Sequence, residues 1–505
     1  MSILLNADQN DFWNRVATEL SKFASKGLVW AKKALDFIDK NSFDREKIQT
    51  AIQYAINMKV VAQIMPDFLL NATNSENDSD SQNGEGITNI EHLFHRLNRQ
   101  GTPLAGEELV YSMMKSHMPK IAKKIDAVAD KRMPSSKLVQ LSVRLALSDN
   151  SELKGNYNVT QIRKMASVQE NDKNKVINFI DNELEDTTKT VDFWLTEGGE
   201  WGLLSVLKTG IVMYSPDVYC LLLYLARKYP NLNEETFRRI AGIALFVHWF
   251  VEGKDRRSVV NSIYKHIVKT DSQSILSKMV ESLKNKEIVD YLKRLQKPEL
   301  IGQLIDFNIG NIEKWNWSKC KDQYKIIMSE VKKDENYEIG YDKYISPFLM
   351  TIKENKEFLL YAQRAYLRER FPDYDPARKD LWKNINRPWD FDHILPSKFF
   401  YNKKTSDPYI EFCKQWGYSI GNLRAWPFED NRSDQAITTK DKMKAEKFWT
   451  DSYIHDSERD GYGKEDVIRN PEVAYKFGIS CKSRIIRIYE EWYKNFNISE
   501  LQIGT

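Results

Sequence analysis

The chain has 505 residues, 42% of them hydrophobic and 12% aromatic, which is ample for globular packing but too long for one compact core. We therefore expect two to four domains. The formal net charge is only +4, with acidic and basic residues interspersed. Net charge thus gives no evidence of a nucleic-acid partner, and any phosphate-binding groove must be local.

The spacing of the cysteines and the hydropathy of the chain argue against several classes of protein. Cys220, Cys320, Cys413 and Cys481 lack C-x-x-C spacing, which argues against a disulfide framework or a cysteine zinc site and predicts buried, reduced thiols. No signal peptide opens the chain, and the most apolar run, residues 240–251, is too short to span a bilayer. We expect a cytoplasmic protein that does not associate with membranes.

The residue patterns predict a mainly α fold with a small α+β module at the C-terminal end. Three domains are expected, at residues 1–133, 134–356 and 357–505. In the first, residues 11–40 show helical periodicity and residues 58–70 are apolar enough for a strand. Residues 71–86 are rich in Asn, Ser, Asp and Gly and predict a disordered loop, after which Thr88 and Glu91 form a capping box.

The segment after that capping box carries a recognisable phrase. It reads Leu93-Phe94-His95-Arg96-Leu97-Asn98-Arg99-Gln100-Gly101-Thr102-Pro103-Leu104 and continues with Gly106-Glu107-Glu108-Leu109. The phrase resembles a segment of GmrSD-type restriction proteins, the type IV, modification-dependent family. Those proteins join a ParB-like, nucleotide-using N-terminal domain to a C-terminal HNH nuclease. The resemblance implies that residues 1–133 are the latter part of such a DNA-sensing domain.

The N-terminal region also departs from that family, because the Asp-Gly-Gln-Gln-Arg run associated with nucleotide binding is missing. We therefore expect either a second polypeptide that supplies this half or loss of the half altogether. Leu28, Val29 and Trp30 are candidate contacts for such a subunit. Arg96 and Asn98 either face a nucleotide completed by the partner or hold a helix-to-turn junction.

The middle domain is predicted to be helical. Ser215-Pro216-Asp217 is a favourable helix start, with an N-cap hydroxyl and proline at the first position. A second helix is expected to begin at Asn233, with Phe237, Ile240 and Ile243 at helical spacing. His248, in the apolar continuation of that helix, is interpreted as a hydrogen-bonded core histidine rather than a metal ligand.

The C-terminal domain is predicted to contain a strand–strand–helix unit. The first strand is expected from Trp389 to Leu395 and the second from Tyr418 to Trp426, with residues 397–417 forming a small excursion between them. A helix follows from Asn431 to Trp449, and another helix precedes the unit within residues 357–370. On the final helix, Arg484, Arg487 and Lys494 alternate with aromatic residues. They either track a phosphate backbone or cover a packed aromatic stripe.

This unit carries the residues with the clearest chemistry: Asp390, Asp392, His393, Asn422 and Asn431. A histidine can act as a neutral base near physiological pH, and carboxylate and amide oxygens suit Mg²⁺. Taken singly, each residue also fits a surface hydrogen bond, a turn or a helix N-cap. Their order resembles the HNH, or ββα-metal, nuclease motif.

The HNH resemblance implies a role for each residue. His393, expected to face solvent, is the general base, Asp392 and Asn431 hold Mg²⁺ or Mn²⁺, and Asn422 positions the loop that carries the histidine. Asp390 and Arg432 support the site.

The predicted function is a metal-dependent HNH endonuclease that cleaves double-stranded DNA in anti-phage defence, acting on foreign or modified DNA, alone or as one subunit of a split system. Two alternatives remain open: a non-catalytic DNA-binding or assembly subunit, and an HNH toxin or effector that acts on other nucleic acids.

Overall fold

The computed structural model describes residues 17–18, 20–22, 24–25, 29–40, 106–197, 199–286, 288–330, 340–375, 388–401, 407–428, 444–463 and 466–501. The chain divides into two compact units, Met1–Ala105 and Gly106–Thr505. The boundary between the two compact units therefore lies after residue 105. The predicted domain boundaries at residues 133 and 356 stay predictions.

In the first unit the described residues are helical. They include α2, Val29–Lys40, which lies within the stretch predicted to be helical from residue 11 to residue 40. Several predictions for this unit lie outside the described residues: the strand at 58–70, the loop at 71–86, the capping box at Thr88 and the positions of Arg96 and Asn98.

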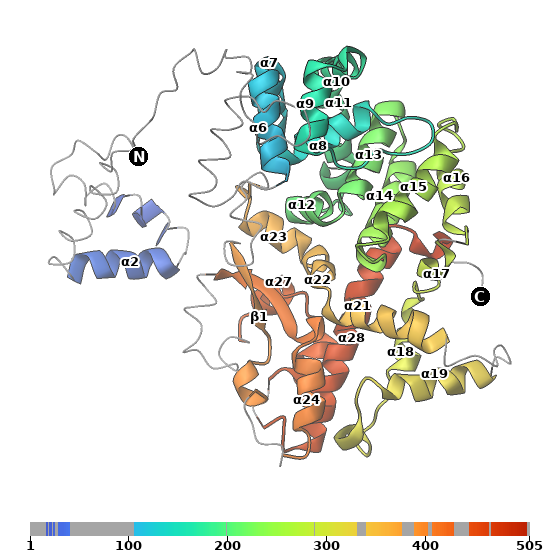
Figure 1. The fold of residues 1–505 in the computed structure, drawn as a ribbon. Helices are drawn as coiled ribbons and strands as arrows, with labels where there is room; N and C mark the ends of the chain where they lie inside the picture. The colour runs from blue at the N-terminus through green and yellow to red at the C-terminus, as the bar shows by residue number, and fades with distance from the viewer. Residues whose placement is uncertain are drawn as a thin grey trace, which may run out of the picture. The chain divides into compact units, whose positions relative to one another are not determined.

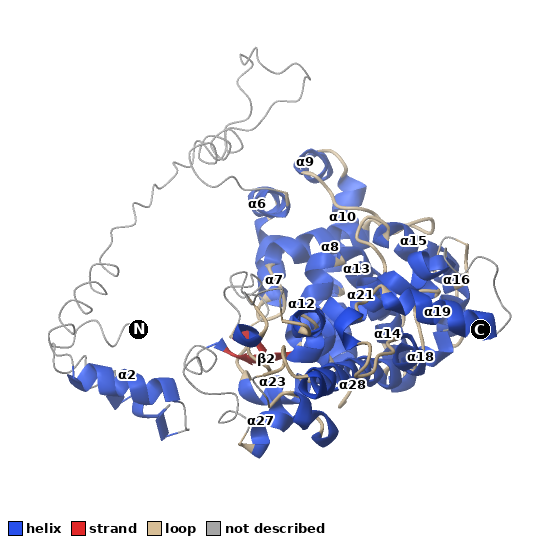
Figure 2. Ribbon diagram, turned by 90° about the horizontal axis from the view of Figure 1, so that it is seen from below, coloured by secondary structure: helices blue, strands red, loops and turns tan. Residues whose placement is uncertain are grey.

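The second unit is mainly helical, as predicted, with a single two-stranded sheet among its described residues (Figures 1 and 2). Its N-terminal and middle helices are α6 (Glu107–His117), α7 (Pro119–Ala129), α8 (Ser135–Ala146), α9 (Val159–Ser167), α10 (Glu170–Asn182), α11 (Leu184–Asp192), α12 (Ser205–Tyr214), α13 (Pro216–Lys228), α14 (Glu234–Phe250), α15 (Arg256–Ile267), α16 (Ile275–Leu283), α17 (Val289–Leu292), α18 (Pro298–Leu304), α19 (Lys319–Glu330) and α21 (Ser346–Glu354).

The C-terminal part holds α22 (Lys356–Ala362), α23 (Arg364–Arg370), β1 (Trp389–His393), α24 (Ile410–Gly417), β2 (Leu423–Pro427), α27 (Glu446–Asp451) and α28 (Pro471–Asn495). The first predicted strand is confirmed at Trp389–His393. The second begins later than predicted, because the chain before it forms α24 and a short 3-10 turn, Ile420–Asn422. Of the helix predicted from Asn431 to Trp449, residues 431–443 lie outside the described residues, and the described end contains α27.

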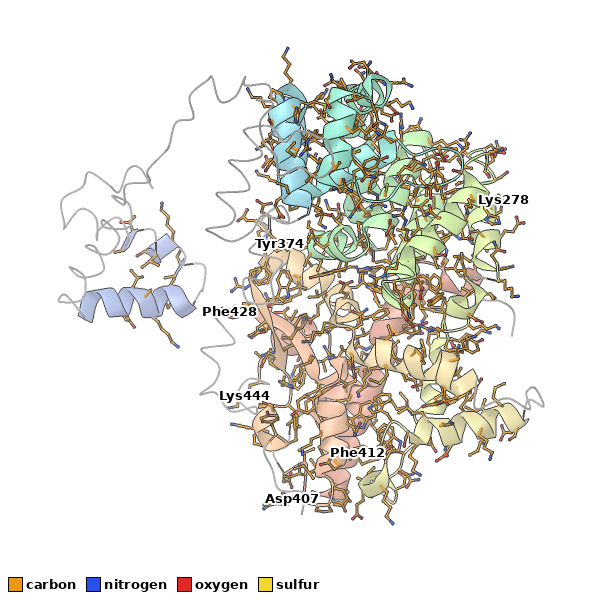
Figure 3. All side chains as sticks on the ribbon, viewed as in Figure 1. Lys278, Tyr374, Asp407, Phe412, Phe428 and Lys444 are labelled. Carbon is orange, nitrogen blue, oxygen red and sulfur yellow. The ribbon has the colours of Figure 1, made fainter. Side chains whose placement is uncertain are left out.

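Helix α28 is the long central element against which α18, α22, α24 and the Ile420–Asn422 turn pack. Figure 1 shows it running alongside α24. The two helices approach closely at Gly478, where an added Cβ would lie 2.4 Å from the ring of Phe412, a residue labelled in Figure 3. Glycine at this position therefore allows α24 to seat against α28.

The predicted helix starts in the middle region are correct, although one cap differs. Asn233 caps α14 by accepting a hydrogen bond from the backbone N–H of Thr236 at 2.9 Å. Ser215 precedes α13 but its hydroxyl does not cap it, because Oγ lies 2.6 Å from Nδ1 of buried His248. Nε2 of His248 lies 2.9 Å from Oε2 of Glu357. His248 is thus a hydrogen-bonded core residue, as predicted.

All four cysteines are free and buried, as predicted. Within the described residues, no single helix is both long enough and apolar enough to cross a membrane. The apolar pair α12 and α13 bends by 111° between its two members.

Candidate functional site

The candidate site is built on the antiparallel pair of β1 and β2. The register places Asp392 opposite Arg424 and His393 opposite Leu423. Strand β1 alternates acidic and aromatic residues before reaching His393, so Asp390 and Asp392 lie on the same side of the strand. The sheet thereby brings the predicted residues Asp390, Asp392, His393 and Asn422 into one short stretch of structure.

His393 ends β1 and is half-buried, rather than facing solvent as the sequence suggested. Its ring centroid lies 5.9 Å from that of Phe400 and 6.2 Å from that of Tyr418. Burial lowers the pKa of His393 below its ordinary value of 6.5, while the neighbouring Asp392 carboxylate acts in the opposite direction. The imidazole therefore stays neutral over a wider pH range than a free histidine would.

Asn422 fixes the main chain that follows His393. Its side chain is fully buried. The amide oxygen accepts a hydrogen bond from the N–H of Leu395 at 2.8 Å, and the amide nitrogen donates to the carbonyl of Leu395 at 3.0 Å and to that of Gly417 at 3.2 Å. The Asn422 carbonyl also accepts from the N–H of Ile394 at 2.8 Å. These bonds join the turn before β2 to the chain that follows β1.

Asp392 has a partner that the sequence did not predict. The guanidinium of Arg424 donates to Oδ2 of Asp392 from Nη2 at 2.8 Å and from Nε at 3.0 Å. Arg424 is fully buried, with its guanidinium carbon 3.9 Å from the ring centroid of Trp426 and 4.2 Å from that of Phe448. Asp392 is thus held in one orientation by its Oδ2 atom.

A second residue that sequence reasoning missed is Gln363, between α22 and α23. It is buried, its amide oxygen accepts from the N–H of Ala425 at 2.7 Å, and its amide nitrogen donates to the carbonyls of Ala425 and Asp451. Gln363 therefore pairs with the outer edge of β2 as a neighbouring strand would. In the sequence, the signal for this residue is an amide side chain that follows the apolar run of residues 358–362.

Three basic residues of α28 make hydrogen bonds or ion pairs within the fold. Arg484 is fully buried and donates to the carbonyls of Ile420, Gly421, Ser452 and Tyr453. Arg487 pairs with Glu458, and Lys494 pairs with Glu490. The interpretation as a phosphate ligand is therefore wrong for the fully buried Arg484, and it stays a prediction for Arg487 and Lys494. Arg484 instead braces the turn that carries Asn422.

Four predicted site residues, Asn431, Arg432, Arg96 and Asn98, lie outside the described residues. Among the residues that the structure does describe, no group of three or more His, Cys, Asp or Glu side chains is placed to hold a metal ion. The oxygen donors present in β1, Asp390 and Asp392, match the chemistry of a Mg²⁺ ion that keeps several waters and needs only one or two carboxylates.

Comparison with protein-family models, with curated proteins and with solved structures found no match. The resemblance to GmrSD-type proteins and to HNH nucleases thus rests on the sequence phrases quoted above.

Replacing Asn422 by alanine is expected to lower the free energy of unfolding by about 1–3 kcal/mol, because main-chain groups of Leu395 and Gly417 lose a buried partner. DNA cleavage should fall as well, since the turn after His393 is no longer fixed. Urea denaturation and a cleavage assay measure the two effects. Asn174→Ala, at an exposed position within α10, is the matched control and should leave both nearly unchanged. If Asn422→Ala and Asn174→Ala are equally stable, the side-chain hydrogen bonds of Asn422 do not stabilise the chain after His393.

Proposed function

We propose that the protein is a Mg²⁺-dependent HNH-type endonuclease that hydrolyses phosphodiester bonds of double-stranded DNA. The observation that carries the proposal is the buried Asn422 amide, which holds both main-chain groups of Leu395 two residues after His393. A histidine with a lowered pKa, a carboxylate beside it and an asparagine that fixes its loop support general-base hydrolysis. The role in defence against foreign or modified DNA comes from the GmrSD resemblance.

In this reaction His393 accepts a proton from the attacking water. The water oxygen forms a bond to phosphorus, the bond from phosphorus to the 3′ oxygen breaks, and that oxygen takes a proton from solvent. Because burial keeps the imidazole neutral, His393 is ready to accept a proton at neutral pH. Asn422 and Arg484 act at a distance from the reacting atoms, by keeping the histidine loop and the turn before β2 in place.

A bound Mg²⁺ supplies positive charge to the phosphate oxygens on which negative charge develops. Asp392 is the described residue best suited to hold it, since Arg424 engages Oδ2 and leaves Oδ1 without a hydrogen bond to a described residue. Asn431 is the second proposed ligand and Asp390 a supporting carboxylate.

One observation favours the alternative of a non-catalytic DNA-binding or assembly subunit. The Asp392–Arg424 ion pair is nearly buried, and a carboxylate in such a pair can serve the fold alone. We also propose that a second polypeptide supplies the nucleotide-using half of the N-terminal domain that the GmrSD resemblance implies.

Cleavage is expected to require Mg²⁺ or Mn²⁺, and EDTA should stop it without lowering the unfolding temperature, since the proposed ion is bound by few protein groups. The test incubates the chain with modified and unmodified double-stranded DNA, with and without EDTA, and then restores Mg²⁺ in excess. Full cleavage after exhaustive chelation would refute the metal-dependent mechanism. Binding of DNA without cleavage under every metal condition would favour the assembly subunit.

A further inference from the structure

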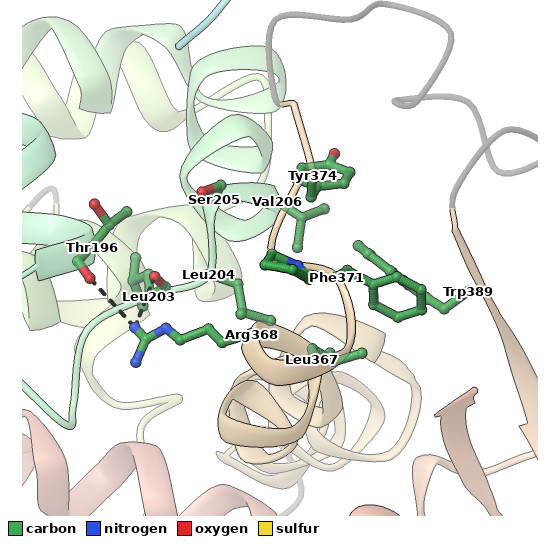
Figure 4. A pocket seen from close by; sticks show the side chains of 11 residues that line it. Thr196, Leu203, Leu204, Ser205, Val206, Leu367, Arg368, Phe371, Tyr374 and Trp389 are labelled. Atoms are coloured by element: carbon green, nitrogen blue, oxygen red, sulfur yellow. Dashed lines mark hydrogen bonds between the residues drawn. The ribbon is translucent and has the colours of Figure 1, made fainter. Parts of the chain in front are cut away.

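The two ends of β1 differ in how far their aromatic neighbours are exposed. The first residue, Trp389, is 3% exposed, and its ring centroid lies 5.5 Å from that of Phe371 and 5.6 Å from that of Tyr374 (Figure 4). These contacts hold the start of the strand in the fold. The last residue, His393, lies instead beside aromatic side chains that are open to solvent.

Two exposed tyrosines, Tyr401 and Tyr418, form a pair next to His393. Tyr418 is 45% exposed, and its ring centroid lies 6.2 Å from that of His393. Tyr401 is 54% exposed, and its ring centroid lies 6.3 Å from that of Tyr418, with 84° between the two ring planes. A flat ring can therefore lie against one tyrosine and meet the other at its edge. The fully buried ring of Phe400 contacts Tyr418 edge to face and supports it from the protein side.

A cation lies near the same side of β1. Lys356, the exposed first residue of α22, places its ammonium 4.8 Å from the ring centroid of Phe391. Phe391 and His393 are two residues apart on the strand, so their side chains point to the same side. Burial is the main cause that lowers the pKa of His393, and the positive charge of Lys356 acts in the same direction. The ammonium is therefore within electrostatic reach of the imidazole.

The strand register sets the order of these groups. Phe391 pairs with Ala425 and His393 pairs with Leu423, so the turn that precedes β2 lies beyond His393. Tyr418 belongs to the chain that leads from α24 into this turn. The lysine thus lies on one side of the histidine, and the tyrosine pair lies on the other. A positive charge combined with exposed aromatic rings is the arrangement that binds a nucleic-acid strand through its phosphates and its bases.

We propose that the strand to be cut lies along this side of β1, with a phosphate at Lys356 and one unpaired base against Tyr418 and Tyr401. A base inside a duplex is covered by its neighbours, so it must leave the stack before a protein ring can cover its face. The preferred substrate is therefore a DNA duplex in which a nucleotide next to the scissile bond is unpaired. The inference rests on the proposed nuclease function and adds the form of DNA that reaches His393.

The first test compares two forms of one DNA sequence, the fully paired duplex and the same duplex with one extra, unpaired nucleotide. Binding to the whole chain is measured by fluorescence anisotropy in EDTA, and cleavage is measured separately with Mg²⁺. We expect the duplex with the unpaired nucleotide to bind at least about fivefold more tightly, because the base is already free to stack on a tyrosine. It should also be cut next to the unpaired position. Equal affinity for the two duplexes would overturn the proposal.

The binding and cleavage measurements separate this proposal from the proposed function. Tighter binding of the duplex with the unpaired nucleotide, without cleavage of either form, would support the binding surface and refute the nuclease. Cleavage of both forms at one rate and with one affinity would support the nuclease and refute the role of an unpaired base.

Variants of the tyrosine pair locate the base. Tyr418→Ala should weaken binding of the duplex with the unpaired nucleotide by about 5- to 150-fold, since the base loses its stacking partner. Tyr418→Phe keeps the ring and should bind as the parent does. Tyr214→Ala, which removes an exposed tyrosine from the end of α12, is the matched control.

Because Tyr418 also contacts His393 and Phe400, Tyr401→Ala provides a second test at a more exposed ring. It should reduce the preference for the unpaired nucleotide and leave the unfolding temperature unchanged. If both alanine variants fold and keep the parent's preference, the tyrosine pair does not bind the base and the proposal fails.

The phosphate contact has a different readout, because it does not depend on base pairing. Lys356→Gln should weaken binding of both duplexes to a similar degree and reduce the slope of log affinity against log salt by about one. Lys269→Gln removes the same charge from an exposed position after α15 and should leave affinity and slope unchanged. An unchanged slope in Lys356→Gln would overturn the placement of a phosphate at Lys356.

Discussion

Replacing His393 by alanine is expected to lower the rate of DNA cleavage by roughly 10²–10⁴-fold, the usual effect of losing a general base. The imidazole also touches the rings of Phe400 and Tyr418, so the alanine variant loses some packing. His393→Asn fills more of the space without providing a base and should be as inactive as the alanine variant. Rates at saturating DNA, measured beside thermal unfolding, separate catalysis from folding.

The matched control is His266→Ala, which removes an exposed histidine from α15 and should leave the cleavage rate unchanged. If a folded His393→Ala variant cleaves DNA at the parent's rate, the base must be another residue. The nuclease proposal would then lose its central group.

The pH dependence provides a further readout of the same residue. Burial disfavours the imidazolium form and so lowers the pKa of His393 below 6.5. The reaction needs the neutral form, so the rate should rise with pH and level off once pH exceeds this lowered pKa. We therefore expect the midpoint of the acid limb below pH 6.5 in the parent protein and its absence in His393→Asn.

Local patterns predicted the elements around the site, because they depend on neighbours in sequence. The alternation of acidic and apolar residues from Trp389 predicted the first strand, and Asn233 predicted the start of α14. The second strand was placed too early because Tyr418 and Ile420 are also strand-forming residues. Their actual conformation depends on tertiary contacts, in which Arg484 bonds to the carbonyls of Ile420 and Gly421.

Partnerships across the fold could not be predicted in the same way. The ion pair of Asp392 and Arg424 depends on the register of two strands, and the bond from Ala425 to Gln363 joins residues 62 positions apart. The sequence shows that these groups are polar but not which group each one meets. The same holds for Ser215, whose hydroxyl was expected to cap α13 and instead meets His248.

Removing the Asp392 carboxylate is expected to have the largest effect on stability. Asp392→Ala removes the carboxylate that pairs with the fully buried guanidinium of Arg424, and breaking a buried ion pair from one side costs about 3–5 kcal/mol. Asp456→Ala is the contrasting control, because its pair with Arg459 is largely exposed, and such pairs contribute about 0–1 kcal/mol. Urea unfolding of the parent and both variants measures the difference.

A double-mutant cycle decides whether the Asp392 carboxylate serves the fold, the reaction or both. Arg424→Met removes the charge on the other side while keeping an apolar stem between Trp426 and Phe448. The combined variant should be less destabilised than the sum of the two single variants, since no unpaired charge remains buried. If stability recovers in the combined variant while cleavage does not, Asp392 has a role in the reaction beyond its ion pair. If the single effects simply add, Asp392 and Arg424 are not coupled, and the ion pair does not hold the carboxylate in place.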